Sequence, residues 1–224
     1  MTRRAVFVAI LALALTAPVF AGDIIAMPTG NTVAPKDIEL NAIWWKQPPS
    51  GTSGDILVGE AFFGVMDRVE LDVLYADVRD AESVTEVNAY VTLLKETPKT
   101  PSFIVGCTNV TGADWLGGTK FGGPSDNDDP SFFAVSSYNL AAPAVPSFKT
   151  PMIRLHLGWG NNWHGDELFG GVQFKVYPNF GGAILNYQSN PAYMLTWQPC
   201  KTMEVTGGTN GGETFFRVGG FLHW

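Results

Sequence analysis

Residues 67–77 read Asp-Arg-Val-Glu-Leu-Asp-Val-Leu-Tyr-Ala-Asp, and apolar and polar side chains alternate along them. Leu71 and Val73 fall on one side of an extended chain, while Glu70 and Asp72 fall on the other. Successive side chains of a β-strand point to opposite faces, so this alternation predicts a strand with one apolar and one polar face. The fold therefore depends on what covers the apolar face.

The same alternation returns along the rest of the chain, and no segment after residue 37 keeps the period of a helix. Turn-forming clusters such as 47–51 and 210–212 separate the runs, because Gly and Asn tolerate positive φ and Pro cannot donate to a sheet ladder. The sequence therefore predicts one all-β domain over 38–224, built from antiparallel strands that follow one another. The expected strands are 38–46, 55–64, 67–77, 84–94, 101–110, 132–139, 151–159, 169–177, 181–188, 192–198, 201–207 and 213–224.

The composition excludes several classes of protein. Of the 224 residues, 46% are hydrophobic and 16% are charged, and the formal net charge is −7. So apolar a chain is not disordered, and an acidic chain without a Lys/Arg cluster is not expected to bind nucleic acid. No nucleophile elbow, phosphate loop or zinc motif occurs in the sequence. We therefore expect no enzyme activity, no metal and no cofactor.

The N-terminus carries a targeting signal. Arg3 and Arg4 precede an apolar run over 5–15, and Val19-Phe20-Ala21 places a small residue at a cleavage position. These are the parts of a secretory signal peptide, and the apolar run is shorter than the roughly 20 residues that span a bilayer. We expect residues 1–21 to be removed by cleavage near Ala21, and residues 22–37 to form a periplasmic leader.

Two architectures fit a chain of alternating strands. A soluble β-sandwich turns its apolar faces toward each other, whereas an outer-membrane barrel turns them toward lipid and its polar faces toward the lumen. In the last strand, Phe216, Val218, Leu222 and Trp224 lie at alternate positions, and an aromatic residue ends the chain. This strand resembles the last strand of bacterial outer-membrane β-barrel proteins. The resemblance implies an antiparallel up-and-down transmembrane β-barrel of about 10–12 strands, in contact with outer-membrane lipid and recognised by the barrel-assembly machinery.

The order of the connections supports the barrel. If the last strand runs toward the periplasm, the longest connection, 111–131, lies outside, and twelve strands leave both termini in the periplasm. Trp44 and Trp159 near strand ends would belong to the aromatic girdles of such a barrel. Against this, segments 192–198 and 201–207 are shorter than the roughly 9–11 residues that a tilted transmembrane strand needs.

Candidate functional side chains follow from the inner face of the barrel. Among the ionisable residues expected to face the lumen, which also include Glu39 and Glu204, the candidates are Glu70, Asp72, Glu86, Arg154, His156, Lys175 and Arg217. Because both signs of charge are present, these side chains either pair and plug the lumen or line a narrow polar pore. In the connection 160–168, the candidates for contact with an external ligand are Trp163, His164 and Asp166, although an ordinary polar loop fits the same residues.

The two cysteines test the register of this barrel. Cys200 is expected in a periplasmic turn, and Cys107 several residues along the strand 101–110. A disulfide needs Cα atoms within about 7 Å of each other. The two cysteines are therefore not expected to form a bridge.

A second resemblance concerns function. In the spacing of its hairpin turns, the chain resembles outer-membrane barrels encoded near exopolysaccharide-secretion systems. The segments that carry this resemblance are Leu168-Phe169-Gly170-Gly171-Val172, Pro178-Asn179, Gln198-Pro199 and Gly207-Gly208. The resemblance implies a role in envelope or polysaccharide biology and assigns no residue. The sequence thus favours a non-enzymatic outer-membrane barrel that acts as a small pore or an envelope structural protein, linked to the passage of polysaccharide or small solutes. The alternative is a secreted, soluble β-sandwich that binds carbohydrate through Trp163 and its aromatic neighbours.

Overall fold

The computed structural model of the chain describes residue 29 and residues 33–46, 55–78, 83–113, 129–141, 152–177, 179–187 and 189–223. In these ranges the chain forms twelve β-strands and one short 3-10 helix, η2 (Asn162–His164). No helix among these residues is long and apolar enough to cross a membrane. The strands are β1 (Asp37–Lys46), β2 (Ile56–Met66), β3 (Val69–Val78), β4 (Val84–Leu94), β5 (Ser102–Thr108), β6 (Ser131–Ala141), β7 (Met152–Gly160), β8 (Glu167–Tyr177), β9 (Phe180–Tyr187), β10 (Asn190–Cys200), β11 (Met203–Asn210) and β12 (Glu213–His223).

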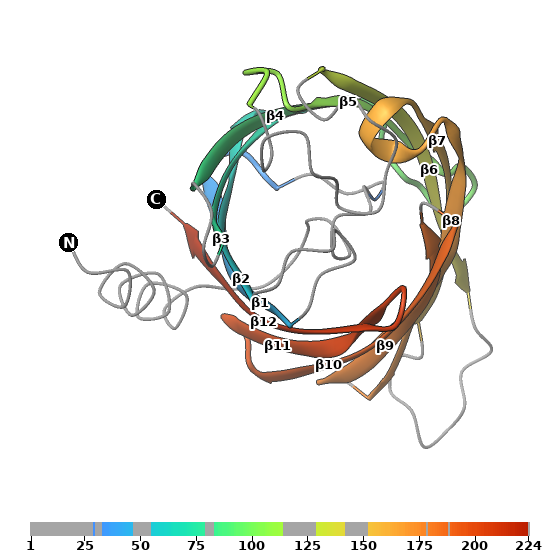
Figure 1. Cartoon of the computed structure of the whole chain (residues 1–224). Coiled ribbons are helices and arrows are strands. Elements are labelled where there is room, and N and C mark those ends of the chain that lie inside the picture. Colours follow the sequence, from blue (N-terminus) through green and yellow to red (C-terminus); the bar gives the residue numbers. More distant parts are fainter. Residues whose placement is uncertain are drawn as a thin grey trace.

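All twelve strands belong to one closed sheet, in which each strand pairs with the next along the chain. The last strand returns to the first in antiparallel register, with Asp37 opposite His223 and Trp45 opposite Phe215. Figure 1 shows the strands as a ring seen nearly end-on. Closure leaves no strand edge unpaired, which is the condition for strands to cross a membrane. The predicted antiparallel up-and-down barrel is confirmed, with twelve strands.

The two faces of the wall differ as an outer-membrane barrel requires. Leu71, Val91 and Leu155 lie on the outer face and are 37%, 38% and 40% exposed. Glu70 and Arg154 lie beside two of them in sequence but face inward, where they are buried. In a β-sandwich the apolar side chains would meet in a dry centre. The soluble sandwich considered as the alternative is therefore wrong.

Strands β10 and β11 are longer than the sequence indicated, with 11 and 8 residues. β10 extends beyond the expected segment at both ends, and at its start Asn190 and Pro191 already pair with residues of β9. A proline without an N–H is tolerated in the first residues of a strand, although turn rules based on sequence end the strand there. Gly211 and Gly212, with φ of 58° and 90°, join β11 to β12 in a two-residue hairpin turn.

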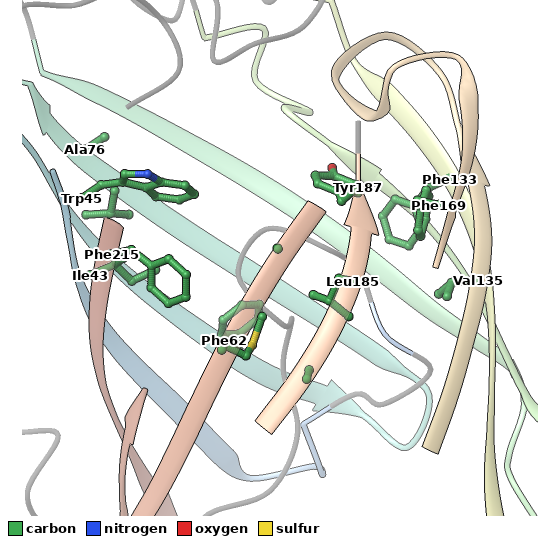
Figure 2. Packing of buried hydrophobic residues seen from close by; sticks show 14 of the residues in the cluster. Ile43, Trp45, Phe62, Ala76, Phe133, Val135, Phe169, Leu185, Tyr187 and Phe215 are labelled. Atoms are coloured by element: carbon green, nitrogen blue, oxygen red, sulfur yellow. The ribbon is translucent and has the colours of Figure 1, made fainter. Parts of the chain in front are cut away.

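The inner wall has two zones. We call the end of the barrel that holds Asp37 and His223 the proximal end, and the opposite end the distal end. Inward-facing apolar side chains dominate the distal half, where Trp45 packs on Phe215 with ring centroids 5.8 Å apart. Figure 2 shows these side chains projecting from several strands toward the interior. The expectation that polar side chains face the lumen is therefore corrected in part: they are concentrated toward the proximal half, although Glu86 on β4 and Thr108 on β5 lie toward the distal end.

The cysteines are both free. Cys107 lies within β5, and Cys200 is the last residue of β10. The prediction that they do not form a bridge is confirmed.

The described residues just before β1 contact the barrel wall. The amide of Lys36 donates a hydrogen bond to the carbonyl of Gly64 (3.2 Å), and the amide of Val33 donates one to the carboxylate of Glu70. A Cβ atom at Gly64 would come within 1.9 Å of the carbonyl oxygen of Ala34, so this close approach needs glycine. This part of the expected leader therefore lies against the proximal ends of β2 and β3.

Candidate functional site

Carboxylates gather on one side of the inner wall. They are Glu39 on β1, Glu60 on β2, Glu70 and Asp72 on β3, and Glu86 on β4. Each belongs to the inward-facing half of its strand, because side chains two positions apart share a face. All except Glu60 are buried. We call these five residues the acidic wall.

Side-chain amides bridge members of the acidic wall. The Nδ2 group of Asn41 donates hydrogen bonds to Glu39 Oε1 (3.0 Å) and Glu60 Oε2 (3.2 Å). Asn88 Nδ2 donates to Asp72 Oδ2 (2.6 Å). A neutral amide donor stabilises a carboxylate without cancelling its charge. The amides thus hold these carboxyl groups in place and bring no positive charge to the wall.

The basic residues of the proximal half lie mostly across the ring, because β7 and β8 stand opposite β1 and β2 in a closed ring of twelve strands. On β7, Arg154 Nη2 pairs with Glu96 Oε2 at 2.7 Å, and His156 Nδ1 lies 2.7 Å from the hydroxyl of Ser137. On β8, Lys175 Nζ donates a hydrogen bond to Gln198 Oε1 (3.3 Å).

Arg217 on β12 is the cation nearest to the acidic wall. Its Nη2 atom pairs with Glu204 Oε1 of β11 at 2.6 Å, and Glu39 and Glu60 also interact with it electrostatically. Arg154 and Arg217 each have a carboxylate partner of their own. Among the described residues of the proximal half, carboxylates outnumber these cations, so the inner wall is acidic overall.

At the distal end, the connection between β7 and β8 folds inward. Figure 1 shows its short helical turn inside the outline of the ring. The ring of His164 has no exposed surface; its Nδ1 atom lies 2.6 Å from Tyr187 Oη, and its Nε2 atom lies 3.4 Å from Thr108 Oγ1. Burial lowers the pKa of His164 from its usual 6.5 to about 3, so the ring is neutral at neutral pH.

Aromatic rings enclose His164. The centroids of Phe133, Phe169 and Tyr187 lie 5.0, 5.9 and 5.9 Å from that of the imidazole. They come from β6, β8 and β9, and Figure 2 shows them together at the same end of the barrel. We call these three rings the aromatic nest. They supply dispersion contacts but little solvation, which explains why the uncharged imidazole is favoured.

Glycines on the wall make room for this nest. A Cβ atom at Gly160 would come within 2.5 Å of His164, one at Gly158 within 2.4 Å of Phe169, and one at Gly106 within 2.4 Å of Phe133. Three positions on two strands, β5 and β7, therefore lack side chains where the aromatic rings and the imidazole lie.

The candidates expected to face the lumen lie on the inner side of the wall. Glu70, Asp72, Glu86, Arg154 and His156 are buried. Lys175 and Arg217 are half-buried. The structure does not bring all seven together, because they divide between the acidic wall and the opposite strands.

The structure does not bring together the three candidates in the connection between β7 and β8. His164 is enclosed within the barrel, whereas Asp166 is exposed; Trp163 lies between them in the chain, in η2. In the last strand, Phe216 is exposed on the outer face, Val218 is buried and Leu222 is half-buried. Trp224 lies outside the described residues.

Sequence reasoning missed Glu60 and Glu96. Glu60 lies between Val58 and Phe62, which are inward-facing and apolar, so the face of this strand could not be read from alternation. Glu96 lies in a connection, and only the folded barrel brings it to Arg154. No signal in the sequence indicated this pair.

Comparison with known proteins identifies the fold. No family model and no curated protein matches the sequence. The structure is similar to that of the KdgM porin, with 13% sequence identity, a TM-score of 0.52, and coverage of 84% of this chain and 99% of that one. The match is to a porin barrel. A structure of the KdgM porin in complex with disordered oligogalacturonate is similar at 12% identity, with a TM-score of 0.51 and the same coverage. At these identities the likeness concerns the fold, and it agrees with the barrel that the last strand indicated.

Proposed function

We propose that this protein is an outer-membrane pore that passes small polar solutes and prefers cations to anions. On this proposal, cleavage near Ala21 releases the mature chain. The barrel-assembly machinery then recognises the last strand through Phe216, Val218, Leu222 and Trp224. The proximal end faces the periplasm and the distal end faces outward, with outer-membrane lipid around the apolar outer face.

The excess of carboxylates on the inner wall carries the proposal. Asn41 and Asn88 hold members of the acidic wall and bring no positive charge to it. Rings or walls of carboxylates in a low-dielectric passage raise the local concentration of cations and repel anions. A lumen of this kind would pass small cations and uncharged solutes.

The same charge argues against an acidic polysaccharide as the solute. One of the similar structures is described as a complex with oligogalacturonate, which is a chain of sugar acids. The acidic wall here would repel such a polyanion. We therefore propose small solutes, or neutral saccharides, rather than polyanions as the cargo.

A second candidate is an envelope structural protein with a closed lumen. Ile56, Ile104 and Thr206 face inward and have no exposed surface. A plugged barrel would bury its inner wall in this way, whereas an open, water-filled one would wet it. Conductance separates the two candidates.

The test is to insert the purified full-length mature protein into planar lipid bilayers and measure the reversal potential in a KCl gradient. A pore of the proposed kind gives discrete conductance steps and a permeability ratio that favours K⁺ over Cl⁻. Asp72→Asn should lower this ratio, because the change removes a charge of the acidic wall. Asp67→Asn is the matched control, since Asp67 is exposed in the β2–β3 turn, where it pairs with Lys95.

Anion preference in the wild type, or equal effects of the two substitutions, would contradict the proposed selectivity. Absence of conductance from correctly inserted protein would favour the structural role.

A further inference from the structure

The turn between β7 and β8 is held inside the barrel by contacts on both of its sides. On one side, Asn161 binds β6: its amide donates to the carbonyl of Phe132 (3.0 Å), and its Oδ1 atom accepts from the amide of the same residue (2.6 Å). Asn162 Nδ2 donates to the carbonyl of Pro130 (3.0 Å). Gly165, with φ of 88°, then reverses the chain into β8.

On the other side, the only strong polar contact described from the turn to β9 passes through His164. Its Nδ1 atom approaches Tyr187 Oη at 2.6 Å, a normal length for a hydrogen bond, whereas the 3.4 Å contact to Thr108 on β5 is weak. The imidazole therefore joins the turn to the far side of the aromatic nest.

An inward turn of this kind is unusual for a connection. Loops normally run over the surface, because water satisfies their backbone groups there. Here the wall lacks a side chain at Gly160, and His164 occupies the space beside it. A polar side chain buried in apolar surroundings costs free energy unless it is hydrogen-bonded, so its position requires the contact with Tyr187.

We propose that residues 161–166 form the constriction of the pore, and that His164 is the positioning residue that holds them across the distal lumen until acid releases them. This inference rests on the proposed pore function and adds the element that sets its size limit. It assigns a role to the buried imidazole of His164, which takes no part in the proposed preference for cations.

The direction of the pH effect follows from the pKa of His164, which differs between the inward position of the turn and a released position. Released into water, His164 has its usual pKa of 6.5; enclosed, it has a pKa of about 3. The released state thus binds more protons between these values, and each unit of pH below 6.5 favours release by about tenfold. The inward position is fully stable above pH 6.5 and is lost as the pH falls.

The groups around the imidazole leave this direction unchanged. Strands β5, β6 and β7 present Thr108, Phe133 and Gly160 to it, and none of these titrates. The titratable groups nearby are Tyr187 on β9, Glu167 at the start of β8 and Asp166 in the turn itself. Both carboxylates accept hydrogen bonds elsewhere, Glu167 from Ser189 Oγ (2.6 Å) and Asp166 from the amide of Asn162 (3.3 Å).

The test measures the largest polyethylene glycol that enters the pore at pH 7.5 and at pH 4.5. The wild type should admit larger polymers at pH 4.5, and His164→Ala should admit them at both pH values. His164→Phe keeps an aromatic ring in the nest but cannot bind a proton, so its size limit should not change with pH. Leu157→Ala, on the outer face of the neighbouring strand β7, is the matched control and should behave as the wild type.

A size limit at pH 7.5 that is the same in His164→Ala and the wild type, or a pH response that persists in His164→Phe, would overturn the proposal.

A second measurement separates this inference from the pore function. Carbethoxylation of His164 by diethyl pyrocarbonate at pH 7.5, followed by mass spectrometry, should be at least tenfold slower in the inserted barrel than in urea-unfolded protein. Tyr187→Phe should increase the rate. Equal rates in folded and unfolded protein would show that the turn is not held inward. Slow modification in a barrel that never conducts would refute the pore, and with it the constriction, but not the inward position of the turn.

Discussion

Leu155→Arg tests whether the outer face of the barrel meets hydrocarbon. Leu155 lies one residue from the middle of the nine-residue strand β7, on the outer face, and is 40% exposed. A cationic side chain at the midplane of a transmembrane barrel costs about 2–4 kcal/mol, which is roughly a 30- to 900-fold change in the ratio of folded to unfolded protein. On a water-exposed surface the same change would stay within about 0.5 kcal/mol.

The assay is urea unfolding of the barrel in lipid vesicles, followed by tryptophan fluorescence. Leu168→Arg is the matched control, because Leu168 is also exposed on the outer face but lies at the distal rim, in the second position of β8. We expect it to cost about 0–1 kcal/mol, the cost near an interface. Equal costs for the two substitutions would refute the argument that lipid surrounds the wall.

Three other predictions concern the wall and its connections. Gly158→Ala should destabilise the barrel by about 1–3 kcal/mol through overpacking, since the new Cβ atom would lie 2.4 Å from a ring carbon. Gly207→Ala should be nearly neutral, because the nearest atoms lie 4.0 Å from its Cβ position; loss of heat-modifiable gel mobility in both variants alike would contradict this contrast. Arg154→Met should cost about 3 kcal/mol in urea unfolding by leaving Glu96 without its cation, and the double variant with Glu96→Gln should recover much of the loss. A water-soluble maleimide should label the exposed Cys200 without prior reduction, and failure to do so would contradict its assignment as a free thiol.

The positions of the strands could be predicted because the outer face of each strand belongs to one continuous apolar surface. The segment 84–94 was predicted with its observed bounds, and 38–46 differs from β1 by one residue. A continuous apolar outer surface makes alternation strict, and turn residues mark the ends of each run. The barrel itself was inferred from the last strand and the order of the connections.

The interior could not be predicted to the same degree. In β2, Val58 and Phe62 face inward while Leu57 and Phe63 face outward, so both faces are apolar and the alternation disappears. The burial of His164 depends on partners contributed by β5, β6, β8 and β9, and on glycines whose only role there is to leave space. These are contacts between strands far apart in the sequence, and no local pattern encodes them.

The central claim is that the apolar face of the wall contacts lipid while the ionisable face is enclosed. The most direct measurement places a nitroxide label at each position from 153 to 158 of β7, in protein with both cysteines replaced by serine and reconstituted into vesicles. Collision rates with oxygen should be high at 153, 155 and 157, whose native side chains are exposed, and low at 154, 156 and 158, which are buried. The opposite phase, or easy access of a water-soluble nickel complex to the outer positions, would contradict the claim.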